Sequence, residues 1–240
     1  MINIKRLIFI LAFFACFFIS EDFSAQKINQ FDNNQQRTGI WKKYYPNKRI
    51  RYVGQFKNGK EVGVFKFYDI TQSDHPVIIK TFFQGSDSLY VQFYSLSGKI
   101  KTEGILKVRK RVGVWKYFYP DGTLMSKENY DDGKLHGEQV VYYKDGKVTE
   151  LSLYKEGLLE GVSSKYSSKG VLIEEVTYKK GKLNGLAKYF ELNGNLKEKG
   201  HYKDGKRVGH WEYYMDGEVA TEEEKKNERK PSLIPQSKKN

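Results

Sequence analysis

A repeat of 24 residues constrains the fold of this 240-residue chain more than any other feature. Glycine opens the same phrase at Gly113, Gly137, Gly161, Gly185 and Gly209. A fixed period of this size is typical of a repeat array, in which each unit packs mainly on its neighbours. Such an array builds an extended surface and encloses no catalytic centre by default, so its function is to be sought on that surface.

The period extends toward the N-terminus. Units begin at residues 39, 63, 89, 113, 137, 161, 185 and 209, and only the step from 63 to 89 is two residues too long. The sixth place is aromatic in every unit: Tyr44, Tyr68, Tyr94, Phe118, Tyr142, Tyr166, Phe190 and Tyr214. Tryptophan recurs at the third place, as Trp41, Trp115 and Trp211. We predict that these third-place and sixth-place rings hold the repeat together through cross-strand contacts, with rings on both faces of a sheet.

Each unit is predicted to be a β-hairpin. An aromatic run over 115–119 is followed by the turn 120–122, a second run over 123–130, and a Gly-bearing turn into the next unit. Helices are disfavoured because turns with glycine interrupt the chain about every twelve residues, close to the mean length of a helix. The sequence therefore predicts an all-β fold, an extended single antiparallel β-meander of about eight 24-residue hairpins and about sixteen strands over 39–220.

The segments outside this array have other signatures. Residues 1–25 read as a secretory signal peptide, with Lys5 and Arg6, an apolar stretch through Ile19, and a small-residue cleavage site ending at Ala25. Export to the periplasm, the cell surface or the medium is expected, with a retained anchor or lipidation at Cys16 as the alternative. Residues 26–38 are predicted to be a linker, and the charged residues 221–240 a disordered tail.

Positive charge is concentrated in the turns that join successive units. The chain carries a net charge of +13, and these turns hold fourteen basic against seven acidic residues. In a meander they share one edge, which is predicted to contact an anionic surface. The candidate contact residues are Lys57, Lys60, Lys107, Arg109, Lys110, Arg111, Lys179, Lys180, Lys182, Lys203, Lys206 and Arg207. The alternative is a solvated edge, where lysines guard against aggregation.

Catalytic motifs are missing from the sequence. The four histidines, at positions 75, 136, 201 and 210, occupy different places in their units, and Cys16 is the only cysteine. No enzyme activity, cofactor, metal or small-molecule substrate is therefore expected. Nucleic acid would suit the charge, but the signal peptide argues against it. The two-residue insertion, in the loop Asp69–Pro76, is the place where one unit could differ in role, or a tolerated surface insertion.

The phrase Tyr130–Gly146, with Asp-Gly-Lys, His-Gly, an aromatic residue and a closing Asp-Gly, resembles a MORN repeat, as does Lys203–Tyr214. The Gly-x-Trp at 39, 113 and 209 is most similar to the bacterial MORN-repeat variant, found in proteins often labelled antitoxins of the YwqK family. The resemblance implies a scaffold, in some cases linked to membranes, and the antitoxin label implies binding to a cytosolic toxin. The chain departs from the pattern in its signal peptide, and within the array at Leu89, Gln139, Ser163 and Ala187.

Together these features predict an exported, non-enzymatic MORN-type protein that binds through its sheet. The expected partner is a cell-envelope protein, held by the aromatic face, or an anionic membrane surface, held by the basic turns. The alternative function is that of an antitoxin-like protein that neutralises a toxin by direct binding.

Overall fold

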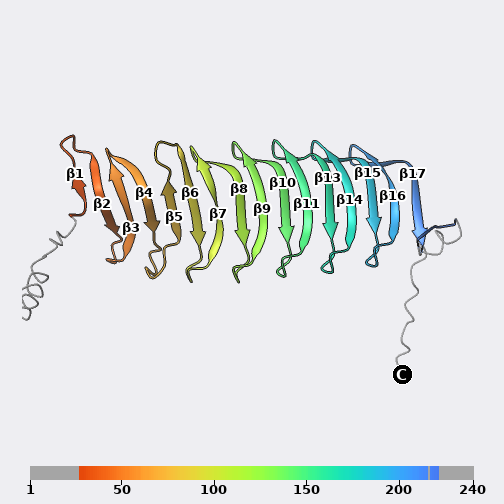
Figure 1. Cartoon of the computed structure of the whole chain (residues 1–240), viewed down its shortest axis with the longest axis horizontal. Helices are drawn as coiled ribbons and strands as arrows, with labels where there is room; N and C mark the ends of the chain where they lie inside the picture. The colour runs from red at the N-terminus through yellow and green to blue at the C-terminus, as the bar shows by residue number, and fades with distance from the viewer. Residues whose placement is uncertain (1–26, 216, 222–240) are drawn as a thin grey trace, which may run out of the picture.

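A computed structural model describes residues 27–215 and 217–221, which form one open antiparallel sheet (Figure 1). No helix occurs in these described ranges. Each strand pairs with the next along the chain, and β11 pairs with both β12 and β13, two pieces of one interrupted strand. The predicted all-β meander of hairpins is confirmed.

The strands are short and evenly spaced along the chain. They are β1 (Gln30–Phe31), β2 (Arg37–Tyr44), β3 (Ile50–Lys57), β4 (Lys60–Phe67), β5 (Ile78–Phe82), β6 (Ser88–Tyr94), β7 (Ile100–Lys107), β8 (Lys110–Phe118), β9 (Leu124–Asp131), β10 (Lys134–Tyr142), β11 (Val148–Lys155), β12 (Leu158–Leu159), β13 (Gly161–Tyr166), β14 (Leu172–Lys179), β15 (Lys182–Phe190), β16 (Leu196–Lys203), β17 (Lys206–Met215) and β18 (Glu218–Val219). The two-residue pieces β1, β12 and β18 bring the number above the sixteen expected.

Two kinds of turn alternate and occupy opposite edges of the sheet. The joining turns connect one unit to the next and lie along the upper edge in Figure 1, whereas the hairpin turns within units lie along the lower edge. Most joining turns have two residues, both with positive φ, as at Asn58 (49°) and Gly59 (73°). Such turns match the twist of antiparallel strands, which explains why glycine fills the second position.

The glycine that opens each unit bends the first strand. Between the pairs Glu103 with Lys116 and Ile105 with Val112, β8 has two more residues than β7. Gly113 lies in this bulge with a φ of 63°, a conformation that glycine adopts at little cost. In the unit that begins with Leu89, β5 and β6 pair without any register shift. The loss of this glycine therefore coincides with the loss of the bulge.

A single row of side chains from the third and sixteenth places of the units crosses the whole sheet and forms its core. Trp41 lies opposite Gly54, and Trp115 packs over Gly104, where a Cβ atom would overlap the indole ring. The buried members of this row are Gly54, Phe65, Val91, Gly104, Trp115, Ser152, Ser163, Val176, Ala187, Gly200 and Trp211. This row runs along the entire array, and the residues buried outside it are few: Phe56, Ser126, Val140, Ser164 and Ala220 among the described residues.

Within this row, neighbours compensate for each other. In three pairs of facing residues, a large aromatic ring packs over a glycine of the neighbouring strand: Phe65 over Gly54, Trp115 over Gly104 and Trp211 over Gly200. Where the ring is lost, the facing residue changes too: Ser163 hydrogen bonds Ser152 (Oγ to Oγ, 2.8 Å), Gln139 donates to Glu128 (3.2 Å), and Ala187 pairs with Val176. These are the positions at which the sequence departs from the repeat pattern.

The sixth-place rings take a smaller part in the core than expected. They are half-buried, and Tyr44 is 52% exposed. The sixth place lies opposite an aliphatic residue of the returning strand, as Tyr44 opposite Ile50 and Phe118 opposite Leu124, next to a register shift. The rings at the eighteenth place of the units pack on third-place rings instead: Phe56 lies between Trp41 and Phe65, and Tyr130 and Tyr202 pack on Trp115 and Trp211.

Short strands cover the two ends of the sheet. The segment 26–38, predicted to be a linker, contains β1 and the start of β2. The Phe31 ring of β1 packs edge-on against the Trp41 ring of β2, with 5.1 Å between the ring centroids. At the other end, β18 pairs with β17, and Ala220 is buried. The predicted signal peptide, and the predicted tail beyond Thr221, lie outside the described residues.

Candidate interaction surfaces

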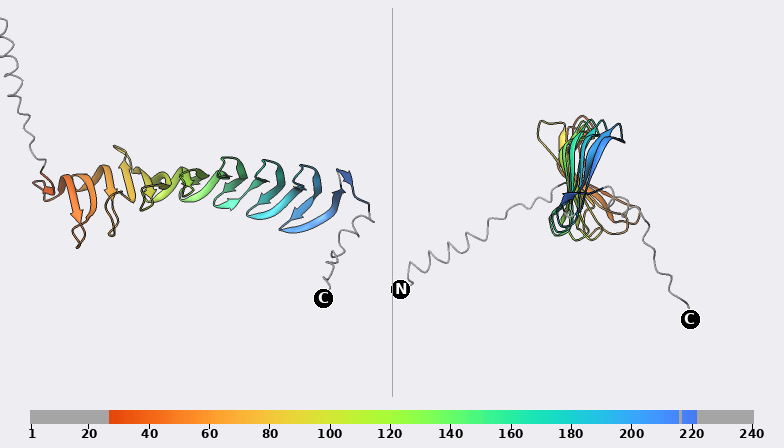
Figure 2. Two further views of the ribbon diagram at one scale, coloured as in Figure 1. Left: turned by 90° about the horizontal axis from the view of Figure 1, so that it is seen from below. Right: turned by 90° about the vertical axis from the view of Figure 1, so that its right-hand side faces the viewer.

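The joining turns and their flanking residues place a series of basic side chains along one edge. We define the basic edge as ten of the predicted contact residues, all exposed: Lys57, Lys60, Lys107, Arg109, Lys110, Lys179, Lys180, Lys182, Lys203 and Lys206. Viewed end-on in Figure 2, the sheet twists about its long axis, but the turns of each edge stay on their own side. The basic edge is therefore continuous in position along the molecule.

Arg111 and Arg207, also predicted to contact an anionic surface, are placed differently. The guanidinium of Arg111 lies over the Trp115 ring at 4.7 Å, and that of Arg207 over the Trp211 ring at 3.9 Å. Arg207 also makes a two-pronged ion pair with Glu198, at 2.8 and 3.0 Å. These hydrogen bonds, which Arg207 donates to the Glu198 carboxylate, are the main cause that raises the pKa of Arg207. Both arginines lie on the sheet face and cover the core, because cations stack favourably on indole rings.

The residue that covers the core varies together with the core itself. In each unit with tryptophan at the third place, the residue two positions before the opening glycine is an arginine: Arg37, Arg111 or Arg207. In the units with Gln, Ser or Ala at the third place, this residue is a leucine: Leu135, Leu159 and Leu183, respectively. The aromatic face is thus used largely for packing, as the sequence predicted for most of its rings.

The lysines of the basic edge are mostly unpaired. Among the residues that the structure describes, Lys110 alone of the ten forms an ion pair, with Asp132 at 2.7 Å. Both side chains are more than half exposed, so this pair contributes little to stability. The charge of the other nine is balanced mainly by solvent and stays available to an anionic partner.

The inserted loop after β4 contacts the turns on both of its sides. Asn47, in the preceding hairpin turn, donates to the carbonyl of Ile70 at 2.9 Å, and Gln72 donates to the carbonyl of Leu96 in the following turn at 2.9 Å. The His75 ring packs against Gly98. The insertion therefore joins three neighbouring hairpin turns on the edge opposite the basic edge.

A polar cluster on the face opposite the tryptophans centres on Glu103. Its carboxylate accepts hydrogen bonds from Lys116 and Gln92, both at 3.2 Å. Burial opposes ionisation of Glu103, but hydrogen bonds from Tyr90, Lys116 and Gln92 together lower its pKa below the ordinary 4.5. The carboxylate is consequently held in its charged form, which suits a structural role.

The described ranges bring no three His, Cys, Asp or Glu side chains together in a way that could hold a metal ion. His75, His201 and His210 fall in a loop and in two different strands, as their unequal places in the repeat indicated. Within the same ranges, no helix is long and apolar enough to cross a membrane.

The repeat phrase, the hairpin geometry and the ring-bearing core can be compared with known proteins. The profile of the MORN repeat variant family matches residues 37–58, 111–132, 135–156, 159–180 and 183–204. These five segments are similar to MORN repeats of the variant type. Each match begins at the arginine or leucine that covers the core. MORN repeats suggest in general a binding or scaffold role.

Between the first and second matched segments, residues 59–110 lie outside the family match. This interval contains the insertion and the unit that begins with Leu89, and yet β4 to β7 continue the meander through it. The unit from residue 209 also lies outside the match, although β17 extends the sheet. The hairpin architecture is therefore broader than the family's sequence pattern.

Other comparisons add little. No curated protein matches the sequence. Among solved structures, one of S. aureus TarM in complex with fondaparinux, alpha-GlcNAc-glycerol and UDP has 17% identity and a TM-score of 0.28, over 40% of this chain and 19% of that one.

Proposed function

We propose that this protein is a non-catalytic scaffold that binds an anionic membrane surface through its basic edge. The observation that carries the proposal is that ten exposed lysine and arginine side chains stand along one edge of a single extended sheet, nine of them without an ion pair among the described residues. Each basic residue close to an anionic surface contributes about 1 kcal/mol to binding. A few joining turns in contact would therefore suffice for stable attachment.

The shape of the array supports this form of attachment. Its units repeat at about 10 Å, twice the spacing of paired strands, so charges recur at a regular interval along the edge. An extended surface of fluid lipid head groups can adapt to the twist seen in Figure 2, because the charged lipids are free to move beneath each turn. The opposite edge and much of the sheet stay accessible for other partners, as expected of a scaffold.

Binding to vesicles tests the proposal. The protein should sediment with vesicles containing phosphatidylglycerol, stay in solution with phosphatidylcholine vesicles, and lose binding steeply as salt is raised. Replacing Lys179, Lys180 and Lys182 by glutamine should weaken binding about 100-fold, since about 3 kcal/mol is removed.

The matched control removes the same number of lysines from the hairpin turns of the opposite edge, at Lys48, Lys144 and Lys169. This variant should bind as the unaltered protein does. Absent binding, binding that ignores salt, or equal losses in both variants would contradict the proposal. The antitoxin-like function stays a prediction from the resemblance alone, and it requires a cytosolic protein, which the mature N-terminus in cell fractions would reveal.

A further inference from the structure

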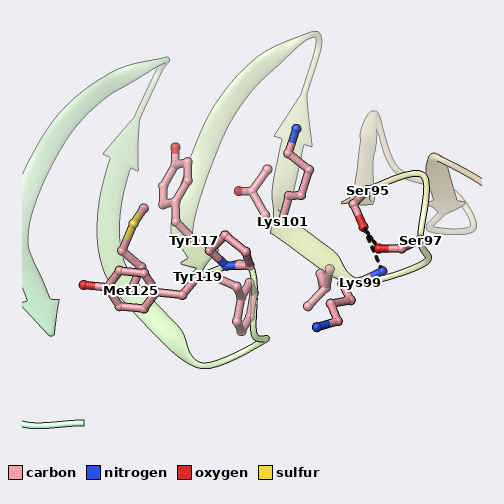
Figure 3. A pocket seen from close by; sticks show the side chains of 11 residues that line it. Ser95, Ser97, Lys99, Lys101, Tyr117, Tyr119 and Met125 are labelled. Carbon is pink, nitrogen blue, oxygen red and sulfur yellow. Dashed lines mark hydrogen bonds between the residues drawn. The ribbon is translucent and has the colours of Figure 1, made fainter. Parts of the chain in front are cut away.

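A cavity of about 420 Å³ lies between two neighbouring hairpin turns, those of the units that begin at residues 89 and 113. Figure 3 shows Ser95, Lys99 and Lys101 on one side of it and Tyr117, Tyr119 and Met125 on the other. Its volume falls in the range of ligand-binding pockets, about 300–1,000 Å³. Its first side, from Ser95 to Thr102, lies outside the family match, and its second side, from Tyr117 to Met125, lies within the matched segment 111–132.

Three units of the repeat show which side chain fills the corresponding space. At the seventh place, Tyr45, Tyr119 and Tyr143 each donate a hydrogen bond from the phenol to the backbone carbonyl of the residue 23 positions later, at 2.9, 2.8 and 3.0 Å. These rings fill the gap between their own hairpin turn and the next one. In the unit from residue 89 the seventh place is Ser95, and the corresponding carbonyl belongs to Phe118, which lines the cavity.

Ser95 does not reach across this gap. Its hydroxyl accepts a hydrogen bond from the backbone N–H of Lys99 at 3.1 Å and hydrogen bonds the Ser97 hydroxyl at 2.9 Å. Both partners lie in the same turn as Ser95. The cavity therefore has the position of a missing tyrosine side chain, with the carbonyl of Phe118 as the acceptor that a phenol would use.

The positive charge of the lining residues favours a ligand that carries an anionic group. Lys99 and Lys101 line the cavity, both are exposed, and neither forms an ion pair within the described residues. No Asp or Glu lines it. An aromatic ring that enters beside these two ammonium groups is favoured when an anionic group accompanies it.

We propose that this cavity binds a tyrosine side chain of a partner protein, flanked in sequence by an acidic residue. The phenol ring occupies the space filled elsewhere by the seventh-place tyrosine and donates to the carbonyl of Phe118. The acidic neighbour contacts Lys99 and Lys101. The protein's own residues 222–240 cannot be the occupant, because they contain no aromatic residue.

This site goes beyond membrane attachment and is independent of it. The cavity lies at the hairpin turns, whereas the basic edge lies at the joining turns, at the other end of β7 and β8. Strands of this length separate the two by about 25 Å. A scaffold attached through the basic edge can thus hold a partner at the opposite edge.

The direct test measures peptide binding to the full chain by NMR or fluorescence. The probe is acetyl-Glu-Tyr-Glu-amide, compared with acetyl-Glu-Ala-Glu-amide and acetyl-Lys-Tyr-Lys-amide. We expect the first peptide to bind at least tenfold more tightly than the other two, with resonance shifts at Phe118 and Lys101. Equal binding of all three peptides, or none, would overturn the proposal.

Two variants locate the binding. Ser95→Tyr supplies the missing ring and should reduce binding at least tenfold, whereas Ser167→Tyr, at the seventh place of another unit, should leave it unchanged. Lys101→Glu, at the rim of the cavity, should also weaken peptide binding. This variant provides an independent test in case Ser95→Tyr does not fold. Unimpaired binding by Ser95→Tyr would sink the idea. So would self-association that Ser95→Tyr abolishes, because the occupant would then be a second copy. Vesicle binding should be the same in all these variants.

Discussion

At the scale of single residues, the sheet is held by complementary pairs in its central row. Trp115 and Trp211 each face a glycine at the sixteenth place of the preceding unit, because the indole ring lies where a Cβ atom would be. Serine faces serine and valine faces alanine elsewhere in the row. The size of the third-place residue and the size of its neighbour therefore change together, although they are eleven positions apart.

Exchanging pairs between units tests this complementarity. Gly104→Ser should destabilise the protein by about 1–3 kcal/mol, because the added atoms overlap the ring of Trp115. Adding Trp115→Ser reproduces the pair formed by Ser152 and Ser163, so the double variant should lose less stability than the two single variants lose together. Urea unfolding of the two single variants and the double variant measures the coupling. Strictly additive effects would show that the two positions do not interact.

The sequence predicted the fold well and the individual contacts less well. Period, turn residues and alternating aromatic runs suffice for the meander, because each unit is local and repeats. The sequence did not predict that Arg111 and Arg207 cover the tryptophans, because both arginines follow a basic turn and were expected to be exposed. In the structure, the bulge at the opening glycine turns these side chains onto the face of the sheet. The cavity at Ser95 was missed as well, because tyrosine is absent from several seventh places and its absence at Ser95 alone did not stand out in the sequence.

At the scale of strands and turns, one joining turn is strained. Val108 and Arg109 have φ of 45° and 68°, where other joining turns place glycine second. A β-branched residue at positive φ is a particularly unfavourable choice, and Val108 is 68% exposed. This turn lies in the middle of the basic edge, where its two side chains extend beyond those of an Asp-Gly turn.

Relieving this strain should stabilise the protein. Val108→Asp combined with Arg109→Gly copies the turn at 132–133 and should raise stability by about 1 kcal/mol, measured by thermal unfolding. The reverse exchange, Asp132→Val with Gly133→Arg, should lower stability by a similar amount. A neutral first exchange would mean that the turn is adapted to its residues in a way that dihedral angles do not show.

The cluster around Glu103 predicts a dependence of stability on acid. Hydrogen bonds lower the pKa of Glu103 in the folded protein, so its contribution is complete above the ordinary value of 4.5 and is lost as the pH falls through the lower folded value. Glu103→Gln should reduce the loss of stability below that pH, whereas Glu138→Gln, at an exposed position, should not. Urea unfolding at a series of acid pH values measures the free energy of unfolding of the unaltered protein and of both variants. Identical dependence of this free energy on pH in all three proteins would contradict this role of Glu103.

At the scale of the whole molecule, stability and function both follow from a sheet that stays open. Among the described residues, its ends are covered by the short strands β1 and β18, as is common for terminal units of repeat proteins. The open form keeps the two edges chemically different, with basic joining turns on one side and the inserted loop and cavity on the other. Closure into a compact barrel would remove this separation.

Small-angle X-ray scattering of the full chain in solution measures this openness. Strands spaced about 4.8 Å apart make an array roughly 80 Å long, with a rod-like distance distribution that has an extended tail. We expect a radius of gyration well above the value of about 18 Å for a compact globule of this length. A symmetric distance distribution with a radius of gyration near the compact value would contradict an extended scaffold with two separate edges.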